Sequence, residues 1–378
     1  MPRDLPANAA GWRAAAREFA DRWVVPAAAG IDQADRIPDA LIAELRDARF
    51  LGLGLPREWD GVGGDARSIS AVLEELSRGS AAVGVLVAVH LSVCAAPILD
   101  WGTSAQREKY LRPLARGEGI GAFGLTEPGA GSDTASLATR YGRAGDGFRL
   151  RGTKMFTSNG ASAGAILVFA TRDPALGHAG ISAFIVPTGT PGFSVAQRLD
   201  KLGLRGSETT ELVLEDVHVP SDALLGPEGA GLKVALSALA GGRIGIASCA
   251  LGVAQAAFDK MLRAVRADDA PWRRTLVARA FADLSAARAL VERAAERKDA
   301  GAPFVTEASV AKLVASRAAV AIASAGVDVA GPAGVRRGDP AERLLRDARV
   351  FPIVEGTTEI QELILGRHLV EPARFPNS

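Results

Sequence analysis

The spacing of apolar residues divides the chain into three parts. In residues 9 to about 117, apolar positions recur at steps of three and four, which predicts amphipathic helices separated by turns. Between about 119 and 220, short β-rich runs such as Ala165–Thr171 predict strands, and Asp146-Gly147 marks a turn between two of them. From Gly231 onward the helical spacing returns. Its clearest stripe consists of Ile244, Ala247, Leu251, Ala254, Phe258 and Met261.

This order of helices, sheet and helices predicts an α+β protein and excludes the βαβα alternation of a doubly wound nucleotide-binding fold. We expect an N-terminal helical domain at 1–118, a middle antiparallel β domain at 119–224 and a C-terminal helical bundle at 225–378. At 378 residues, the chain is long enough to bury its cores without disulfide bonds.

Charge and composition exclude several classes of partner. The chain has 44 Lys and Arg against 43 Asp and Glu, so nothing in its net charge favours nucleic acid or an anionic membrane. No apolar run approaches the roughly 18 residues of a membrane span, the longest being Ala81–Val89, and the N-terminus has no signal-peptide core. Cys94 and Cys249 are expected to be buried thiols, and neither they nor the four histidines have a metal-ligand spacing. We therefore expect a cytoplasmic protein without membrane insertion or a metal.

A glycine-rich stretch, Phe123–Asp133, is the first candidate for chemistry. Its three glycines allow close backbone approach to a ligand, and the hydroxyls of Thr126 and Ser132 lie among backbone N–H groups suited to polar or phosphate atoms. A tight loop capped by Ser132 or Asp133 is the structural alternative. The stretch is neither a Rossmann fingerprint nor a P-loop, because it lacks their flanking residues.

Two further motifs, Gly152–Gly160 and Val354–Gln361, change the interpretation. Together with the glycine-rich stretch they resemble the acyl-CoA dehydrogenase family, FAD enzymes that oxidise acyl thioesters between the α and β carbons. Six other stretches match the family in order: Pro56–Gly64, Gly102–Leu111, Lys201–Ser207, Val217–Pro220, Gly241–Gly245 and Arg346–Arg349. The resemblance implies the family fold, an N-terminal helical domain, a middle β domain and a C-terminal four-helix bundle.

The resemblance also implies which residues hold FAD. The positions that match the family's flavin contacts are Phe123, Leu125, Thr126, Ser132, Phe156, Ser158 and Thr357. Phe156 takes the place of an aromatic residue packed on the flavin, whereas a strand with one inward ring is the alternative. Gly331 and Gly334 match a turn that meets the FAD of a neighbouring subunit, or they simply form an interhelical turn.

Glu355 matches the catalytic base of the family. Abstraction of an α proton requires a carboxylate close to the α carbon and hydrogen bonds to the thioester oxygen. Burial should raise the pKa of Glu355 above that of an exposed Glu. The resemblance assigns the substrate contacts to Ser132, Arg243, Val354 and Gly356. The alternative role for Glu355 is to stabilise the dipole of a following helix, and the alternative for Arg243 is a structural ion pair.

The sequence departs from the family at several positions. The Arg-x-x-Phe-Gly motif, which holds the FAD pyrophosphate and adenine of the partner subunit, is absent around Arg266–Arg274, and Asp328 replaces a Gln. Ala240-Gly241-Gly242 lacks the acidic residue that contacts the pantetheine arm, and Val354 replaces a Tyr. These changes put the adenosine half of the FAD site in question and allow an acyl carrier other than free CoA.

The resemblance implies an FAD-dependent dehydrogenase in which Glu355 removes the α proton and flavin N5 accepts the β hydride. The substrate is then an acyl-CoA or an acyl carrier protein thioester, the electron acceptor an electron-transferring flavoprotein, and the assembly a homotetramer or homodimer. A flavin oxidase or monooxygenase and a non-catalytic member of the same fold are the alternatives.

Overall fold

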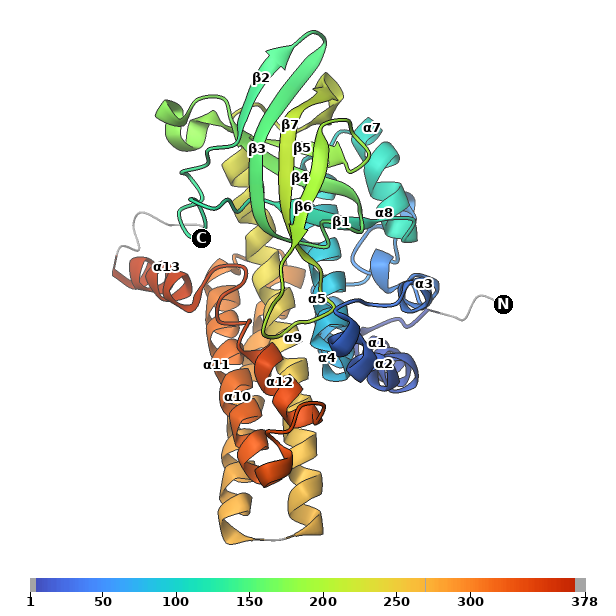
Figure 1. Cartoon of the computed structure of the whole chain (residues 1–378), viewed down its shortest axis with the longest axis vertical. Helices are drawn as coiled ribbons and strands as arrows, with labels where there is room; N and C mark the ends of the chain where they lie inside the picture. The colour runs from blue at the N-terminus through green and yellow to red at the C-terminus, as the bar shows by residue number, and fades with distance from the viewer. Residues whose placement is uncertain (1–4, 269, 371–378) are drawn as a thin grey trace.

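The computed structural model describes residues 5–268 and 270–370, and in it a β sheet lies at one end of the molecule, next to N-terminal and C-terminal helices that pack against each other (Figure 1). The predicted order of helices, sheet and helices is confirmed. The N-terminal helices are α1 (Ala9–Phe19), α2 (Val25–Ala34), α3 (Asp39–Asp47), α4 (Ala66–Gly79), α5 (Ala81–Val89), α6 (Ala96–Trp101), α7 (Ser104–Gln106) and α8 (Arg112–Arg116).

Polar caps and π-helical segments shape this helical part. The Asp65 carboxylate accepts the backbone N–H of Ser68 at 2.8 Å and begins α4. A π-helical segment, His90–Ala95, joins α5 to α6, so that residues 81–101 form one continuous helix. Within it, His90 accepts the N–H of Gly121 at 3.0 Å through Nδ1, and its Nε2 lies 2.9 Å from the carbonyl oxygen of Leu51. His90 is fully buried and links the helices to the sheet, which is a structural role.

The sheet contains β1 (Ile120–Gly124), β2 (Arg140–Ala144), β3 (Gly147–Ser158), β4 (Ala163–Thr171), β5 (Ile181–Pro187), β6 (Phe193–Arg198), β7 (Thr209–Pro220) and β8 (Leu224–Leu225). Its strand order is β6-β7-β3-β2-β4-β5-β8, with β1 paired to β4. The predicted turn is present between β2 and β3, an antiparallel hairpin whose turn residues are Gly145 and Asp146, while Gly147 begins β3.

The sheet is not purely antiparallel, which refines the expectation from the sequence. β1 pairs with β4 in parallel, and β2 meets β4 in parallel at one pair, Arg140 with Thr171. Turn signals mark hairpins between consecutive strands, whereas the β1–β4 pairing joins strands separated by a long loop and another hairpin. Such pairings depend on tertiary packing and leave no local signal.

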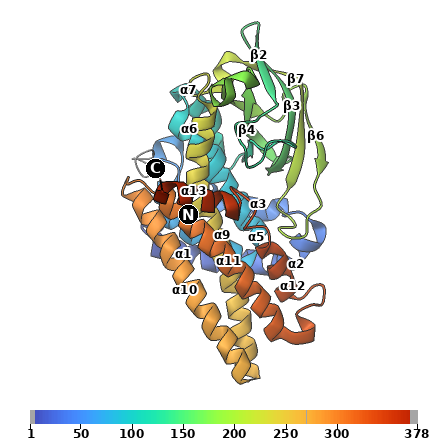
Figure 2. The same ribbon diagram turned by 90° about the vertical axis from the view of Figure 1, so that its left-hand side faces the viewer.

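The C-terminal part is built on three long helices, α9 (Gly231–Ala267), α10 (Pro271–Asp299) and α11 (Val305–Ala330). The shorter α12 (Pro340–Ala348) packs on α9 and α11, and α13 (Thr358–Val370) packs on α11. The predicted four-helix bundle thus corresponds to α9, α10, α11 and α12. The far ends of α9 and α10 extend beyond the rest of the molecule (Figure 2).

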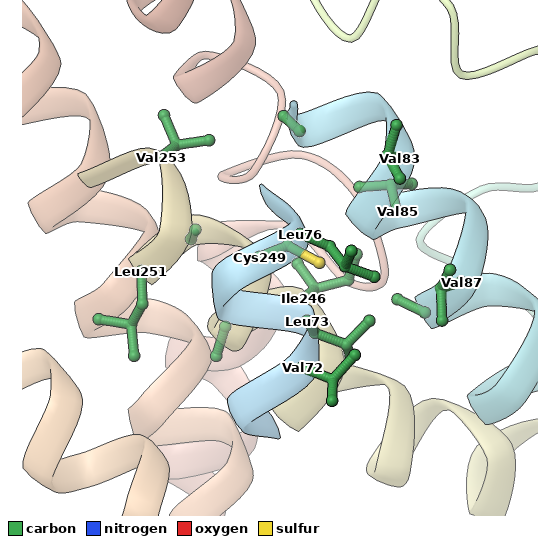
Figure 3. Packing of buried hydrophobic residues seen from close by; sticks show 14 of the residues in the cluster. Val72, Leu73, Leu76, Val83, Val85, Val87, Ile246, Cys249, Leu251 and Val253 are labelled. Atoms are coloured by element: carbon green, nitrogen blue, oxygen red, sulfur yellow. The ribbon is translucent and has the colours of Figure 1, made fainter. Parts of the chain in front are cut away.

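The largest core lies where α4, α5 and α9 meet. Figure 3 shows side chains of all three helices converging, among them Val72, Leu76, Val85, Ile246 and Cys249. Each large apolar side chain removed from water here stabilises the fold by about 1.5–3 kcal/mol. The core therefore joins the N-terminal and C-terminal helices. Both cysteines are buried and unpaired, as predicted, and burial raises the pKa of each to about 12.

Within the described residues, three helices are long and apolar enough to cross a membrane by length and composition alone, namely Ala81–Trp101, Gly231–Ala267 and Val305–Ala333. This corrects the expectation that no apolar segment approaches that length. Single polar residues such as His90 and Ser92 keep the individual apolar runs short, but mean hydropathy over 18 residues is high. In the fold, 83% of the apolar window of the first two helices is buried inside the molecule, against 50% for the third.

Candidate active site

A buried ion pair holds the glycine-rich loop that follows β1. Lys154 on β3 donates to the Glu127 carboxylate at 2.6 Å and to the Leu125 carbonyl at 3.2 Å. Glu127 in turn accepts the backbone N–H groups of Ala138 and Thr139 at 2.6 and 3.1 Å. Burial lowers the pKa of Lys154 to about 8. Burial is the largest single effect on Glu127 and opposes its ionisation, but the Lys154 charge and the hydrogen bonds from Lys154, Thr139 and Ala138 together outweigh burial and lower the pKa of Glu127.

The same loop carries the first group of predicted flavin contacts. Phe123 is half-buried and packs on Phe169 with ring centroids 4.9 Å apart, while Leu125 is buried. The backbone oxygen of Thr126 accepts the N–H of Met155 at 2.8 Å, which joins the loop to β3. Among the described residues, the hydroxyls of Thr126 and Ser132 have no hydrogen-bond partner and so remain available to a ligand.

Phe156 lies in a strained and exposed position on β3. Its φ is +57°, next to a register shift between β3 and β7, and 64% of the residue is exposed. Non-glycine residues with positive φ are uncommon and concentrate at functional sites. The ring therefore does not point into the core, contrary to the alternative of an inward aromatic. Nearby, the Asn159 side chain donates to the carbonyls of Leu86 and Gly121, both at 3.2 Å, and fastens this end of β3 to α5 and β1.

Glu355 lies in the loop between α12 and α13, where its φ is +51° and that of Gly356 is +94°. Its carboxylate is directed onto α9 at Gly242. A Cβ atom on Gly242 would lie 2.0 Å from Glu355 Oε2 and 3.1 Å from Val93 Cγ1. Gly242 is therefore required by the close approach of the carboxylate. Oε2 is buried and forms no hydrogen bond within the part of the chain that the structure describes.

Two cations face Glu355 from different helices. Arg243 on α9 is 6% exposed and donates to the Ser309 hydroxyl at 3.4 Å, whereas Lys312 on α11 is fully buried. Burial raises the pKa of Glu355 to about 7, and the charges of Lys312 and Arg243 oppose this rise. Burial likewise lowers the pKa of Arg243, and it lowers that of Lys312 to about 8. Such a carboxylate can exchange a proton near neutral pH.

Two further predicted residues, Val354 and Thr357, flank Glu355 and Gly356 in the chain. Val354 packs against the main core, and the Thr357 hydroxyl accepts the N–H of Ile360 at 3.3 Å at the start of α13. The acidic residue in the first turn of α13 is Glu359, and Glu355 precedes the helix. This geometry disfavours a helix-dipole role for Glu355.

Gly331 and Gly334 are not brought to Glu355 within one chain. They follow the far end of α11, which places Gly331 about 28 Å from Lys312 along the helix. Gly331 has a φ of +62°, and a Cβ on Gly334 would lie 2.7 Å from the Val327 carbonyl, so both glycines have reasons within their own turn. Their contact with a neighbouring subunit's FAD stays a prediction.

The region that lacks Arg-x-x-Phe-Gly forms the end of the α9–α10 hairpin. Arg273, a cation in this region, donates to the carboxylate and to the backbone oxygen of Asp268, the latter at 3.0 Å. The Asp268 side chain therefore competes with any anion for this guanidinium.

Sequence reasoning missed three residues that the structure places at the site, Gly242, Lys312 and Gln361. Both Lys312 and Gln361 donate to the carbonyl oxygen of Gly356, at 2.7 and 3.0 Å. A signal for Lys312 was present, because it is a lone charge among the small and apolar residues of Ala308–Ala315.

Comparison with known proteins shows the family and agrees with the observed fold. The N-terminal, middle and C-terminal domain families of acyl-CoA dehydrogenase match residues 8–118, 122–217 and 229–370. The mitochondrial short-chain specific acyl-CoA dehydrogenase of Bos taurus is 41% identical over 380 residues, covering 98% of this chain and 92% of its own.

Two solved structures have nearly the same fold. Butyryl-CoA dehydrogenase from Megasphaera elsdenii is 36% identical with a TM-score of 0.94, covering 98% of this chain and all of its own. A chain in the structure of the electron transferring flavoprotein of Acidaminococcus fermentans is 36% identical with a TM-score of 0.95, over the same shares.

Proposed function

The chain belongs to the acyl-CoA dehydrogenase family, and from this premise we propose that Glu355 is the base of an FAD-dependent dehydrogenation of a short-chain acyl-CoA. FAD-dependent acyl-CoA dehydrogenation, an oxidation of a CH–CH bond, is the activity of this chain. The short chain length is supported by the names of its relatives, including the butyryl-CoA enzyme. These likenesses favour dehydrogenation over the oxidase, monooxygenase and non-catalytic alternatives.

One observation carries the assignment of Glu355. Its Oε2 atom is buried without a hydrogen-bond partner in the described chain, against a glycine that leaves it room. The carboxylate is therefore free to accept the α proton, and its pKa of about 7 suits proton exchange at neutral pH. Protonation removes the cost of the buried charge, while Arg243 and Lys312 favour the ionised form that starts the reaction.

Backbone geometry suits stabilisation of the thioester oxygen. Among the described residues, the N–H of Glu355 donates to no other group, and the positive φ of Glu355 turns the backbone sharply at this point. We assign this N–H to the thioester carbonyl, whose oxygen gains negative charge as the α proton leaves. A donor fixed in a dry site stabilises that charge more strongly than water does.

The residues of β1, β3 and the glycine-rich loop fit FAD. Phe156 offers an exposed ring to a planar partner, and the hydroxyls of Thr126 and Ser132 have no hydrogen-bond partner within the described residues. When bound, FAD supplies the acceptor for the β hydride. Thr126, Ser132, Phe156, Ser158 and Thr357 would hold its flavin half, while the protein excludes water from the reacting atoms.

An anaerobic titration tests the proposal. The purified, FAD-supplemented protein is mixed with acyl-CoAs of increasing length and with the same acyl groups on carrier protein, and the oxidised flavin band is followed. We expect short acyl-CoAs to bleach the flavin of the wild-type protein, and to bleach that of Glu355→Gln about 10²- to 10⁴-fold more slowly. Bleaching only by the carrier-protein thioesters would redirect the substrate, and equal bleaching by Glu355→Gln would remove Glu355 as the base.

The partner, assembly and location follow from the same premise. We propose an electron-transferring flavoprotein as the electron acceptor, a homotetramer or homodimer as the assembly, and the cytoplasm as the location. The half-exposed apolar window of α11 supports association with a second copy. A monomer in sedimentation that still holds FAD would contradict the assembly.

A further inference from the structure

Two side chains from different helices converge on the carbonyl oxygen next to the base. Lys312 Nζ on α11 lies 2.7 Å from the oxygen of Gly356, and Gln361 Nε2 on α13 lies 3.0 Å from the same atom. Both side chains are fully buried. Since Gly356 and Glu355 both have positive φ, these two donors restrain a loop in a backbone conformation that is otherwise unfavourable for Glu355.

The hydrogen bond to the Gly356 carbonyl does not require a charged donor such as Lys312. Gln361 already donates to the carbonyl without a charge, and a buried ammonium is costly unless its charge is compensated. Lys312 forms no salt bridge with any carboxylate in the described ranges. Its strongest attraction is to Glu355, through space. The buried charge is thus accounted for by the carboxylate one residue before the carbonyl that it holds.

Among the described groups around Glu355, the positive charges are those of Lys312 and Arg243. From α9 come the guanidinium of Arg243 and the thiol of Cys249, whose own pKa burial raises to about 12, so that it stays neutral. The segment between α5 and α6 contributes the apolar side chain of Val93. From α13, Glu359 faces Lys312. Lys312 and Arg243 are therefore the two charges that oppose the effect of burial on Glu355.

We propose that Lys312 is a positioning residue for α-proton abstraction, because it clamps the Gly356 carbonyl, keeps Glu355 over Gly242 and favours the ionised carboxylate. The inference rests on the proposed role of Glu355 as the base. It separates two contributions, a hydrogen bond that Lys312 shares with Gln361 and a positive charge that Gln361 lacks.

Three variants of the FAD-loaded enzyme separate these contributions. Lys312→Gln keeps a donor without the charge, Lys312→Arg keeps the charge, and Gln361→Met removes a donor without altering charge. The rate of flavin bleaching in a single turnover is measured between pH 5.5 and 9, with FAD content and melting temperature recorded for each variant. Below its pKa the base is protonated and inactive, so each profile has an acidic limb.

We expect Lys312→Gln to move the acidic limb to higher pH by about one unit, since an opposite charge nearby favours ionisation of a carboxylate by at least that much. Gln361→Met and Lys312→Arg should both leave the acidic limb at its wild-type pH, because both keep a positive charge near Glu355. An unmoved limb in Lys312→Gln, or an equal movement in Gln361→Met, would overturn the inference.

Glu355→Gln keeps this result distinct from the proposed function. If Glu355→Gln bleaches as fast as the wild type, the assignment of the base fails and the inference fails with it. If Glu355→Gln is inactive while Lys312→Gln matches the wild type at every pH, only the inference fails. Should Lys312→Gln lose its FAD, the limb of Lys312→Arg decides: a limb at higher pH than the wild type would overturn the inference.

Discussion

Replacing Gly242 by alanine should displace Glu355, the proposed base, without unfolding the protein. The new Cβ would lie 2.0 Å from Glu355 Oε2, whereas real Cβ atoms essentially never approach another heavy atom within 3.0 Å. The carboxylate, at the end of a flexible side chain, must therefore move by at least about 1 Å. A displacement of about 1 Å in a reacting group can cost about 10²-fold in rate. We expect a loss of that order in the reductive half-reaction of Gly242→Ala.

The fold should tolerate this change. Alanine in a helix interior is favoured over glycine by about 0.8–1 kcal/mol, which offsets the tighter contact of 3.1 Å with Val93. Gly326→Ala on α11 is the matched control, because a Cβ there would meet its nearest neighbours, in Ala257 and Met261, at 3.8 Å. We expect this control to keep the wild-type rate and to gain slightly in stability.

Stopped-flow bleaching of the flavin by a short acyl-CoA measures the rate, and thermal unfolding measures the stability. A Gly242→Ala variant that bleaches at the wild-type rate would refute the placement of Glu355 over Gly242. Equal rate losses in Gly242→Ala and Gly326→Ala would refute the local steric argument.

Glu355→Gln should retain its flavin and lose about 10²- to 10⁴-fold in bleaching rate. It should also unfold at a higher temperature than the wild type at pH 8. Folding raises the pKa of Glu355 to about 7, so keeping this carboxylate ionised in the fold lowers the stability of the wild type once the pH exceeds the pKa of Glu355 in the unfolded chain, and the full cost is present above pH 7. Lys154→Met leaves the buried Glu127 carboxylate unpaired and should destabilise the fold by about 3–5 kcal/mol with loss of FAD, whereas Arg143→Met, at an exposed ion pair, should cost no more than about 1 kcal/mol in urea unfolding. Phe156→Ala should leave the unfolding midpoint of the FAD-free protein unchanged, since the ring is mostly exposed, and should weaken FAD binding in a fluorescence titration; a large loss of stability would contradict its placement.

The roles of single residues were harder to predict than the fold. In the sequence, Gly241-Gly242 belonged to a stretch that matches the family and also to Ala240-Gly241-Gly242, which lacks an acidic residue; neither observation assigned a role to Gly242. In the structure, the Glu355 carboxylate packs directly against Gly242, where a Cβ atom would leave it no space. The two residues are far apart in the chain, and no local pattern signals that a side chain from one segment needs space on another.

The partners of buried charges were equally hard to predict from the sequence. Lys154 and Glu127 lie in two recognised motifs, yet their ion pair depends on β3 running beside the loop after β1. Lys312 interrupts an apolar helix, and only the arrival of the loop before α13 gives its ammonium a carbonyl to bind. The sequence shows where a charged residue lies in the chain, whereas the fold decides what that residue contacts and whether it is buried.

The sequence by itself determined the order of helices, sheet and helices, the family, and the motifs that contain the proposed base and the predicted flavin contacts, because periodicity and motifs are local properties of the chain. Only the tertiary structure decided the parallel β1–β4 pairing, the outward position of Phe156, and the burial that raises the pKa of Glu355 to about 7. These depend on which distant segments exclude water from one another, since desolvation and through-space charge act between neighbours in space and not along the chain.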